Sequence, residues 1–335
     1  MTRLSTPITE LADHYEVVVV GSGYGGAIAA SRLARAGRDV CLLERGRERW
    51  PGDFPDTLWE AARELQLNGP GGHHGPRTGL YEVHHNPEMN VVVGCGLGGT
   101  SLINANVSLP PDDRVWQLDA WPAALQADMA SVHSGIERAR AMLRPSPVPL
   151  PADPPPTGLA KLAVFREAAE RTGHGAKFSR PPINVAFTTG PNAAGVHQDE
   201  CTHCGDCVAG CNVGAKTTTL MTYLPDAWHH GAKIFTEVSV RSLERRGEQW
   251  VIHLEPLGVG RERFDGPDPF ITADLVVLGA GSLGSTEILL RSARDGLAVS
   301  GRVGQRFTGN GDVLGFSYDG TDEVDGVGWG DRTRS

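Results

Sequence analysis

EVVVVGSGYGGAIAASRLARAGRDVCLLERG, residues 16–46, decides the fold of this chain. Its first part, Val17–Val20, is a β-branched run without a polar break, which is typical of a strand buried on both faces of a parallel sheet. The turn GSGYGG leads from this run into an alanine-rich helix expected over residues 27–36, and a second apolar strand follows over residues 40–43. This order of strand, glycine turn, helix and strand predicts a dinucleotide-binding unit.

The glycines of this turn have different expected roles. Gly21 is expected to make the tight turn, Gly23 to let the backbone approach a diphosphate, and Gly26 to let the helix pack closely on the strand. The helix N-terminus offers N–H groups and a positive dipole end to phosphate oxygens. Glu44 lies 18 residues after Gly26, where a carboxylate can accept both hydroxyls of a ribose. Such a carboxylate disfavours NADP, but the motif alone does not separate NAD from FAD.

Further glycine segments favour FAD. GCGLGGTS, residues 94–101, follows a β-branched run, and GAGSLGSTEILLRS, residues 279–292, follows another apolar strand. Glycines this dense imply close backbone approach or positive φ, and the hydroxyls of Thr100 and Ser101 can donate to phosphate. A chain that wraps several such loops around one ligand is expected to hold a long dinucleotide, which favours FAD over a nicotinamide cofactor.

Composition excludes several classes of function. The chain has 335 residues, 40% of them hydrophobic, which is enough for one large domain or two ordinary ones. The net charge is −9 and no basic stripe is visible, so nucleic-acid binding is not expected. Apolar runs are of strand length and the N-terminus lacks the core of a secretion signal, so a cytoplasmic protein without a transmembrane segment is predicted.

The stretches between the glycine segments are expected to be less regular. A short helix is predicted near residues 58–67, and GPGGHHGPRTG, residues 69–79, is predicted to be a mobile loop. Four nearby histidines match no closed zinc site and are expected to be solvated: His73, His74, His84 and His85. Helical spacing predicts core positions at Trp121, Leu125, Met129, Val132, Ile136, Ala139 and Leu143.

Cysteines are concentrated in CTHCGDCVAGC, residues 201–211. The spacing C-x2-C-x2-C-x3-C resembles a ferredoxin-type segment, which favours a [4Fe–4S] cluster; a zinc site and plain structural thiols or disulfides stay open as alternatives. The candidate metal ligands are Cys201, Cys204, Cys207 and Cys211. Cys41 is expected to be a small core residue, whereas Cys95 lies within a glycine loop.

Five stretches together resemble the glucose–methanol–choline (GMC) flavoprotein oxidoreductases, especially their cholesterol-oxidase-like branch. They are GSGYGG with LLERG, GCGLGGTSLINANV, CTHCGDCVAGCNVGAKTTTLMTYLPDA, VVLGAGSLGSTEILLRS and GNGDVLGF. The resemblance implies an FAD enzyme that oxidises the CH–OH group of an alcohol, a sterol or another bulky alcohol, by hydride transfer to flavin N5. It implies FAD contacts at Gly21, Gly23, Gly25, Gly26, Glu44, Arg45, Gly98, Gly99, Ser101, Asn104, Val240 and Gly281.

The resemblance also implies a fold and a domain order. The expected fold class is α/β, an FAD-binding Rossmann-like fold with a mixed central sheet and a partial insertion on the substrate side. The expected parts are an FAD-binding part over 14–110, a helical and linker insertion over 111–194, the cysteine cluster with a second FAD-binding part over 195–312, and the start of a truncated substrate domain over 313–335.

One departure bears on activity. The family's proton-abstracting His and its His or Asn partner lie in the C-terminal part, but the last histidine here is His253 and the chain stops at Ser335. We therefore expect the N-terminal portion of such an enzyme, with no catalytic residue assigned. The alternative is an FAD-binding fragment that is catalytically incomplete. The expected partners are a small-molecule alcohol substrate and an electron acceptor. The nature of that acceptor would make the enzyme either an oxidase or a dehydrogenase.

Overall fold

The chain folds into two compact units in a computed structural model. The first unit combines residues 1–103 with 219–318, and the second combines residues 104–218 with 319–335. The expected boundaries near 110, 194 and 312 stay a prediction. The structure describes residues 3–149, 160–260, 269–309, 320–321 and 324. Residues 150–159 of the expected insertion, most of GNGDVLGF and nearly all of the expected substrate-domain start lie outside the described residues.

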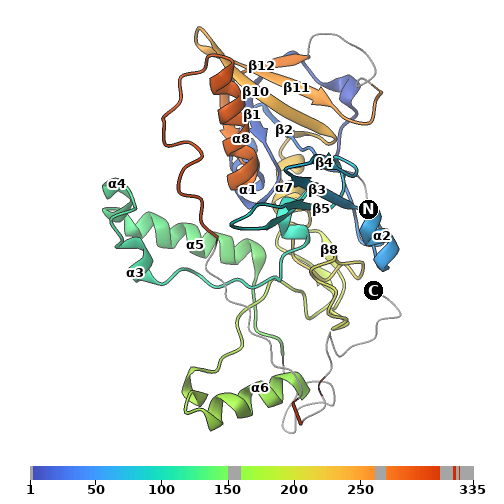
Figure 1. Cartoon of the computed structure of the whole chain (residues 1–335), viewed down its shortest axis with the longest axis vertical. Coiled ribbons are helices and arrows are strands. Elements are labelled where there is room, and N and C mark those ends of the chain that lie inside the picture. The colour runs from blue at the N-terminus through green and yellow to red at the C-terminus, as the bar shows by residue number, and fades with distance from the viewer. Residues whose placement is uncertain (1–2, 150–159, 261–268, 310–319, 322–323, 325–335) are drawn as a thin grey trace. The chain divides into compact units, whose positions relative to one another are not determined.

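A six-stranded sheet with the order β10-β11-β12-β1-β2-β9 forms the centre of the first unit. β12, β1, β2 and β9 run parallel, whereas β10, β11 and β12 pair antiparallel. This arrangement confirms the predicted α/β class with a mixed sheet. Figure 1 shows β1, from the start of the chain, beside β12, from its end. The strands are β1 His14–Val20, β2 Val40–Leu43, β9 Lys233–Phe235, β10 Val238–Arg246, β11 Gln249–Pro256 and β12 Phe270–Leu278.

Helices cover both faces of this sheet. α1 (Tyr24–Arg35) joins β1 to β2 and lies over the face that carries Val19, while α8 (Gly281–Arg294) packs against β10 on the other face. Ile288 of α8 shares a buried cluster with Val18 and Val20. The β-branched run is therefore buried on both sides, as its composition predicted. Cys41 is buried in the same cluster, which confirms it as a core residue.

A smaller sheet occupies the region that was expected to be a helix and a mobile loop. Only α2 (Leu58–Arg63) is helical, and its Thr57–Glu60 capping box fixes its start. The prediction was wrong beyond it, because the following residues form the sheet β4-β3-β5-β6. β3 pairs parallel with β5, and the two outer pairs are antiparallel. These strands are β3 Leu65–Gly69, β4 Gly72–His74, β5 Tyr81–His84 and β6 Val91–Gly94.

The described elements of the second unit are mainly helical, with two short strands. The helical spacing over residues 111–144 predicted which side of α5 is less exposed. Only Leu143 of the seven expected core positions is buried, however, and Trp121 is exposed. The helices are α3 Asp113–Trp116, α4 Ala123–Gln126, α5 Met129–Leu143 and α6 Ala160–Arg171, and the strands are β7 Gly190–Pro191 and β8 His197–Gln198. No helix in the described part of the chain combines the length and apolar character needed to cross a bilayer.

The remaining helices are short. α7 (Tyr223–His229), in the first unit, packs against α1. Residues 215–222 run as extended and turn structure before it. The 3-10 turns are η1 Ile8–Glu10, η2 Gly99–Leu102 and η3 Gly175–Lys177.

Candidate functional site

The candidate site is a cavity of about 590 Å³ in the first unit. It lies where β1 ends, since Gly21 turns the chain with a φ of 90° and Gly23 caps α1 without a side chain. All three glycine elements contribute to its lining. Of the residues expected to contact a cofactor, those that line it are Gly21, Gly23, Gly25, Glu44, Arg45, Gly99, Ser101, Val240 and Gly281.

The glycines here divide into two kinds. A Cβ on Gly23, Gly25 or Gly281 would meet nothing within 4 Å, so the backbone at these positions is open to a ligand. A Cβ on Gly26 would lie 1.9 Å from the carbonyl oxygen of Gly21, which fits the expected close packing of α1 on β1. Gly26 does not line the cavity, because its missing side chain makes room for protein instead of ligand.

Backbone contacts hold the glycine elements against one another. A Cβ on Gly279 would lie 2.7 Å from the Cα of Gly26, and one on Gly99 would lie 2.8 Å from the Cα of Gly23. Gly98, with a φ of 121°, contributes to this packing and is not among the cavity-lining residues. Asn104 also lies outside that lining and belongs to the second unit.

Ser22 joins the first glycine loop to Glu44 and to the second loop, a role that sequence reasoning missed. Its hydroxyl donates to Glu44 Oε2 over 2.5 Å, and the Gly98 N–H donates to that hydroxyl over 2.9 Å. Thr219 continues the network, because its Oγ1 lies 3.1 Å from Ser101 Oγ and donates to the Ser22 carbonyl over 3.2 Å. The only sequence signal for Ser22 was its place inside the GSGYGG turn.

Glu44 is buried and held in one orientation. Its Oε2 accepts from the Ser22 N–H over 3.1 Å, and its Oε1 accepts from the Gly46 N–H over 2.8 Å. Burial raises the pKa of Glu44, although these hydrogen bonds oppose the shift. A carboxylate has about four acceptor directions, and the two bonds from Ser22 and the one from Gly46 leave one of them for a ribose hydroxyl.

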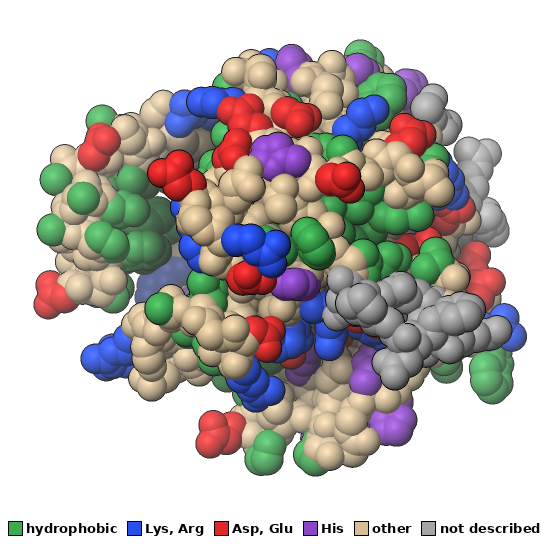
Figure 2. Space-filling view, turned by 90° about the horizontal axis from the view of Figure 1, so that it is seen from above, with side chains coloured by type: hydrophobic (Ala, Val, Ile, Leu, Met, Phe, Trp, Pro, Cys, Tyr) green, Lys and Arg blue, Asp and Glu red, His purple; other side chains and the backbone are tan. Residues whose placement is uncertain are grey.

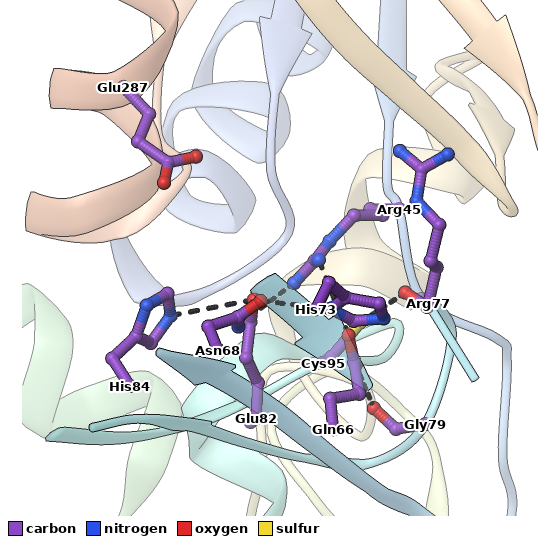
Figure 3. Close-up of polar contacts among 12 residues, drawn as sticks. Arg45, Gln66, Asn68, His73, Arg77, Gly79, Glu82, His84, Cys95 and Glu287 are labelled. Carbon is purple, nitrogen blue, oxygen red and sulfur yellow. Dashed lines mark hydrogen bonds and ion pairs between the residues drawn. The ribbon is translucent and has the colours of Figure 1, made fainter. Parts of the chain in front are cut away.

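A polar group of side chains, Arg45, Asn68, Glu82 and His84, is called the Glu82 cluster here (Figure 3). Glu82 is buried and pairs with the Arg45 guanidinium. Its Oε1 accepts from Asn68 Nδ2 over 3.0 Å and lies 3.4 Å from His84 Nε2. Burial alone would raise the pKa of Glu82, but His84 and Arg45 outweigh it and hold the value at about 2.

His84 corrects one sequence expectation. It lies on β5, only 18% of its side chain is exposed, and it lines the cavity instead of a solvated loop. The interaction with Glu82 raises the pKa of His84 against the opposing effect of burial, and the charge of Glu287 adds to the rise. His73, His74 and His85 are exposed, as expected. Cys95 also lines the cavity, where burial raises its pKa to about 12 and keeps it a thiol.

The four clustered cysteines line one small cavity in the second unit, with a volume of about 20 Å³. The His203 N–H donates to Cys201 Sγ over 3.4 Å, with His203 at a φ of 59°. Lys216 is buried beside this cavity and its Nζ donates over 2.8 Å to the carbonyls of both Asn104 and Cys207. Within the described ranges, no group of three or more His, Cys, Asp or Glu side chains is arranged to hold a metal ion.

Burial dominates the electrostatics of this smaller cavity. It raises the pKa of Cys201 to about 11, with the neighbouring cysteines adding to the rise. Burial also lowers the pKa of Lys216 to about 8, against the opposing influence of Cys207 and Cys211. Burial therefore favours the protonated thiol at Cys201 and at Cys207.

Comparison with known proteins gives a consistent set of relatives. A family model described as GMC oxidoreductase matches residues 15–309. A cholesterol oxidase of Mycobacterium tuberculosis is 29% identical over 304 residues, which cover 83% of this chain and 48% of the relative. A long-chain-alcohol oxidase of Arabidopsis thaliana is 26% identical over 231 residues, covering 68% of this chain and 26% of the relative.

Among solved structures, a pyridoxine 4-oxidase from Mesorbium loti matches with a TM-score of 0.49 and 21% sequence identity. The match covers 83% of this chain and 52% of that protein. The chain spans about half the length of the cholesterol oxidase that it matches.

Proposed function

Because the chain belongs to the GMC oxidoreductase family, we propose that it binds FAD in the 590 Å³ cavity and acts in the oxidation of the CH–OH group of a bulky alcohol. Alcohol oxidation with FAD is the chemistry of the family. The bulky-alcohol class is proposed from the relatives, whose names are cholesterol oxidase and long-chain-alcohol oxidase. The expected cytoplasmic location and the electron acceptor stay predictions.

The observation that carries the proposal is the open backbone at Gly23, Gly25 and Gly281. A Cβ at any of these positions would enter the cavity without touching protein, so a ligand can approach the backbone closely there. The volume lies within the range of small-molecule and cofactor sites, about 300–1,000 Å³. The residues present therefore fit a dinucleotide.

The chain's own residues divide the task of holding FAD. The N-terminus of α1 presents backbone N–H groups and its dipole to the diphosphate. Glu44, oriented by Ser22 and Gly46, would accept a ribose hydroxyl, and Val240, which lines the cavity, would contact the adenine. Bound FAD supplies an acceptor for the hydride of the alcohol carbon. We assign no residue to removal of the hydroxyl proton.

The test is flavin binding and turnover by the purified chain. The expected result is a yellow protein whose flavin band is bleached anaerobically by a sterol or a long-chain alcohol more readily than by a short one. Flavin binding without bleaching by any alcohol would favour the alternative, an FAD-binding fragment without activity. A chain that binds NADH and no flavin would refute the cofactor assignment.

We also propose that the thiols of Cys201, Cys204, Cys207 and Cys211 take up a thiophilic metal centre, with [4Fe–4S] preferred. The support is that all four line one cavity and that donors approach the sulfurs: the His203 N–H at Cys201 and the Asn106 amide at Cys207. Thiolates bound to iron accept such hydrogen bonds. The cavity holds about one water, so the loop has to open for a cluster.

Metal analysis of anaerobically purified protein tests this second proposal. About four irons per chain, with a broad charge-transfer band, are expected for the cluster. One zinc per chain would assign a structural site instead. Protein without metal, carrying four titratable thiols after reduction, would refute the metal centre.

A further inference from the structure

The face of the smaller sheet that meets the cavity combines a polar group with two valines. Side chains alternate along a strand, so Glu82 and His84 of β5 lie on one face, together with Gln66 and Asn68 of β3 and Val91 and Val93 of β6. The other face carries Leu65, Leu67, Val83 and Val92. Inward-facing polar side chains are costly unless they are paired, and each of these four polar side chains has a hydrogen-bond or ion-pair partner.

Glu82 is the anchor of this face. Its side chain is only 10% exposed and it holds Arg45, Asn68 and His84 at once. A buried carboxylate with three partners keeps its charge and fixes the ring of His84 in one orientation. Figure 3 shows the ring directed toward Glu82, with Glu287 of α8 facing it from the other side of the site.

The charged groups around His84 come from three elements. Glu82 lies on its own strand, Arg45 follows β2, and Glu287 lies on α8. His73 of β4 reaches the cluster only through Asn68, whose Oδ1 lies 2.8 Å from His73 Nδ1. The ring of His84 therefore sits among two carboxylates and one guanidinium while lining the cavity.

The cavity gains its excess of positive charge from His84. The cationic side chains that line it are Arg45, Arg77, His84, Arg241 and Arg291. Their carboxylate neighbours are Glu44, Glu82 and Glu287 in the lining, and Glu255, which pairs with both Arg77 and Arg241. The charged groups thus balance when His84 is neutral and leave one positive charge when it is protonated. The arginines do not titrate near neutral pH, whereas an imidazole does.

We propose that His84 is a cofactor-positioning residue: its imidazolium, fixed by Glu82, is the positive charge of this cavity that pH can switch off, and it helps to retain the anionic diphosphate of FAD. The inference rests on the proposed function, because FAD is the ligand. The contact with Glu82 and the charge of Glu287 favour the protonated ring of His84, so FAD should bind more tightly below the pKa of His84 and more weakly as pH rises through it.

The experiment is titration of the flavin-free chain with FAD, followed by flavin fluorescence, from mildly acidic to mildly alkaline pH. His84→Asn should weaken binding at the acidic end by roughly fivefold, the size expected for one partly screened charge, and should flatten the pH profile. His84→Lys, which keeps the charge, should retain tight binding over the whole range. The matched control is His74→Asn, on β4 of the same sheet but exposed, which should behave as the unsubstituted chain.

Three outcomes separate the possibilities. An unsubstituted profile and affinity in His84→Asn would overturn the inference. Weak binding in His84→Lys at every pH would also overturn it, since the charge would then be irrelevant. Failure of the unsubstituted chain to bind FAD at any pH would refute the proposed function instead. Circular dichroism verifies folding. If His84→Asn does not fold, the pH profile of FAD binding by His84→Lys decides: a flat profile supports the inference, and a profile that slopes as in the unsubstituted chain overturns it.

Discussion

At the scale of single residues, the glycines of the site do two different jobs that look identical in the sequence. Gly23 faces open cavity, whereas Gly26 faces the Gly21 carbonyl. Both belong to one GSGYGG turn. The difference lies in what surrounds each Cα, which allows ligand binding to be separated from folding by substituting neighbouring positions.

Alanine at these two positions should therefore change different properties: FAD binding at Gly23 and folding stability at Gly26. Gly23→Ala should keep its stability within about 0.5 kcal/mol, because its φ of −62° suits alanine, but should weaken FAD binding at least tenfold by filling ligand space. Gly26→Ala should lose about 2 kcal/mol or more of unfolding free energy, since its Cβ would lie 1.9 Å from an oxygen. Thermal melting and FAD titration measure the two effects. Equal destabilisation of both variants, or normal FAD binding by Gly23→Ala, would contradict this division.

At the scale of elements, a buried polar junction joins α1 to α7. Ser31 Oγ donates to Asp226 Oδ2 over 2.5 Å, and Arg35 Nε donates to the same oxygen over 2.8 Å. Burial would raise the pKa of Asp226, but the bonds from Arg35 and Ser31 outweigh it and lower the value. α7 has only seven residues, so this junction, together with apolar packing, holds it against α1.

Removing the charge of Asp226 should show how much this polar junction contributes to the free energy of unfolding. Asp226→Asn should lower the unfolding free energy by about 1–2 kcal/mol at neutral pH, a modest value because Arg35 is partly exposed. A lowered folded-state pKa gives stability above the unfolded pKa that is lost as pH falls through the folded pKa. The difference between variant and unsubstituted chain should therefore shrink in acid, as urea unfolding at several pH values would show.

The exposed pair of Glu16 and Arg38 offers a matched control for this measurement. Glu16→Gln should leave stability near neutral pH unchanged within error, because solvent screens an exposed pair. A loss in Asp226→Asn that is the same at all pH values would mean that packing, and not charge, holds the junction.

At the scale of the whole molecule, charge is distributed differently on the surface and in the cavity. The chain carries a net charge of −9, and on the face in Figure 2 acidic and basic side chains are interspersed. The cavity lining instead carries five cationic side chains and three carboxylates. We therefore expect this cavity to attract an anionic dinucleotide although the net charge of the chain is negative.

FAD should stabilise the folded chain as a whole. The glycine elements of residues 21–26, 94–101 and 279–281 meet only when the first unit is folded, so the ligand binds the native state alone. At a hundred times its dissociation constant, FAD should add about 2.7 kcal/mol of unfolding free energy. Thermal melting should show a clear rise with FAD and a smaller one with NADP, which Glu44 disfavours. A larger rise with NADP would contradict the assigned ribose contact.

The local sequence pattern was sufficient to predict the central part of the fold. The βαβ unit, the apolar strands and the glycine turns at their ends were all predictable, because hydrophobic period and glycine spacing are properties of neighbouring residues. The burial of Val18 and Val20 on one face and Val19 on the other follows directly from that run. The choice of FAD came from three separate glycine segments and the family resemblance.

Long-range pairing decided the rest. Residues 65–69 and 81–84 become strands because β3 and β5 supply each other's hydrogen bonds in register, and the local sequence pattern does not predict this pairing. The same pairing moves His84 from an expected loop into the cavity and places it beside Glu82. Ser22, Glu44, Gly98 and Thr219 likewise meet only through folding, since hydrogen bonds between residues so far apart in the chain depend on where the backbone brings them.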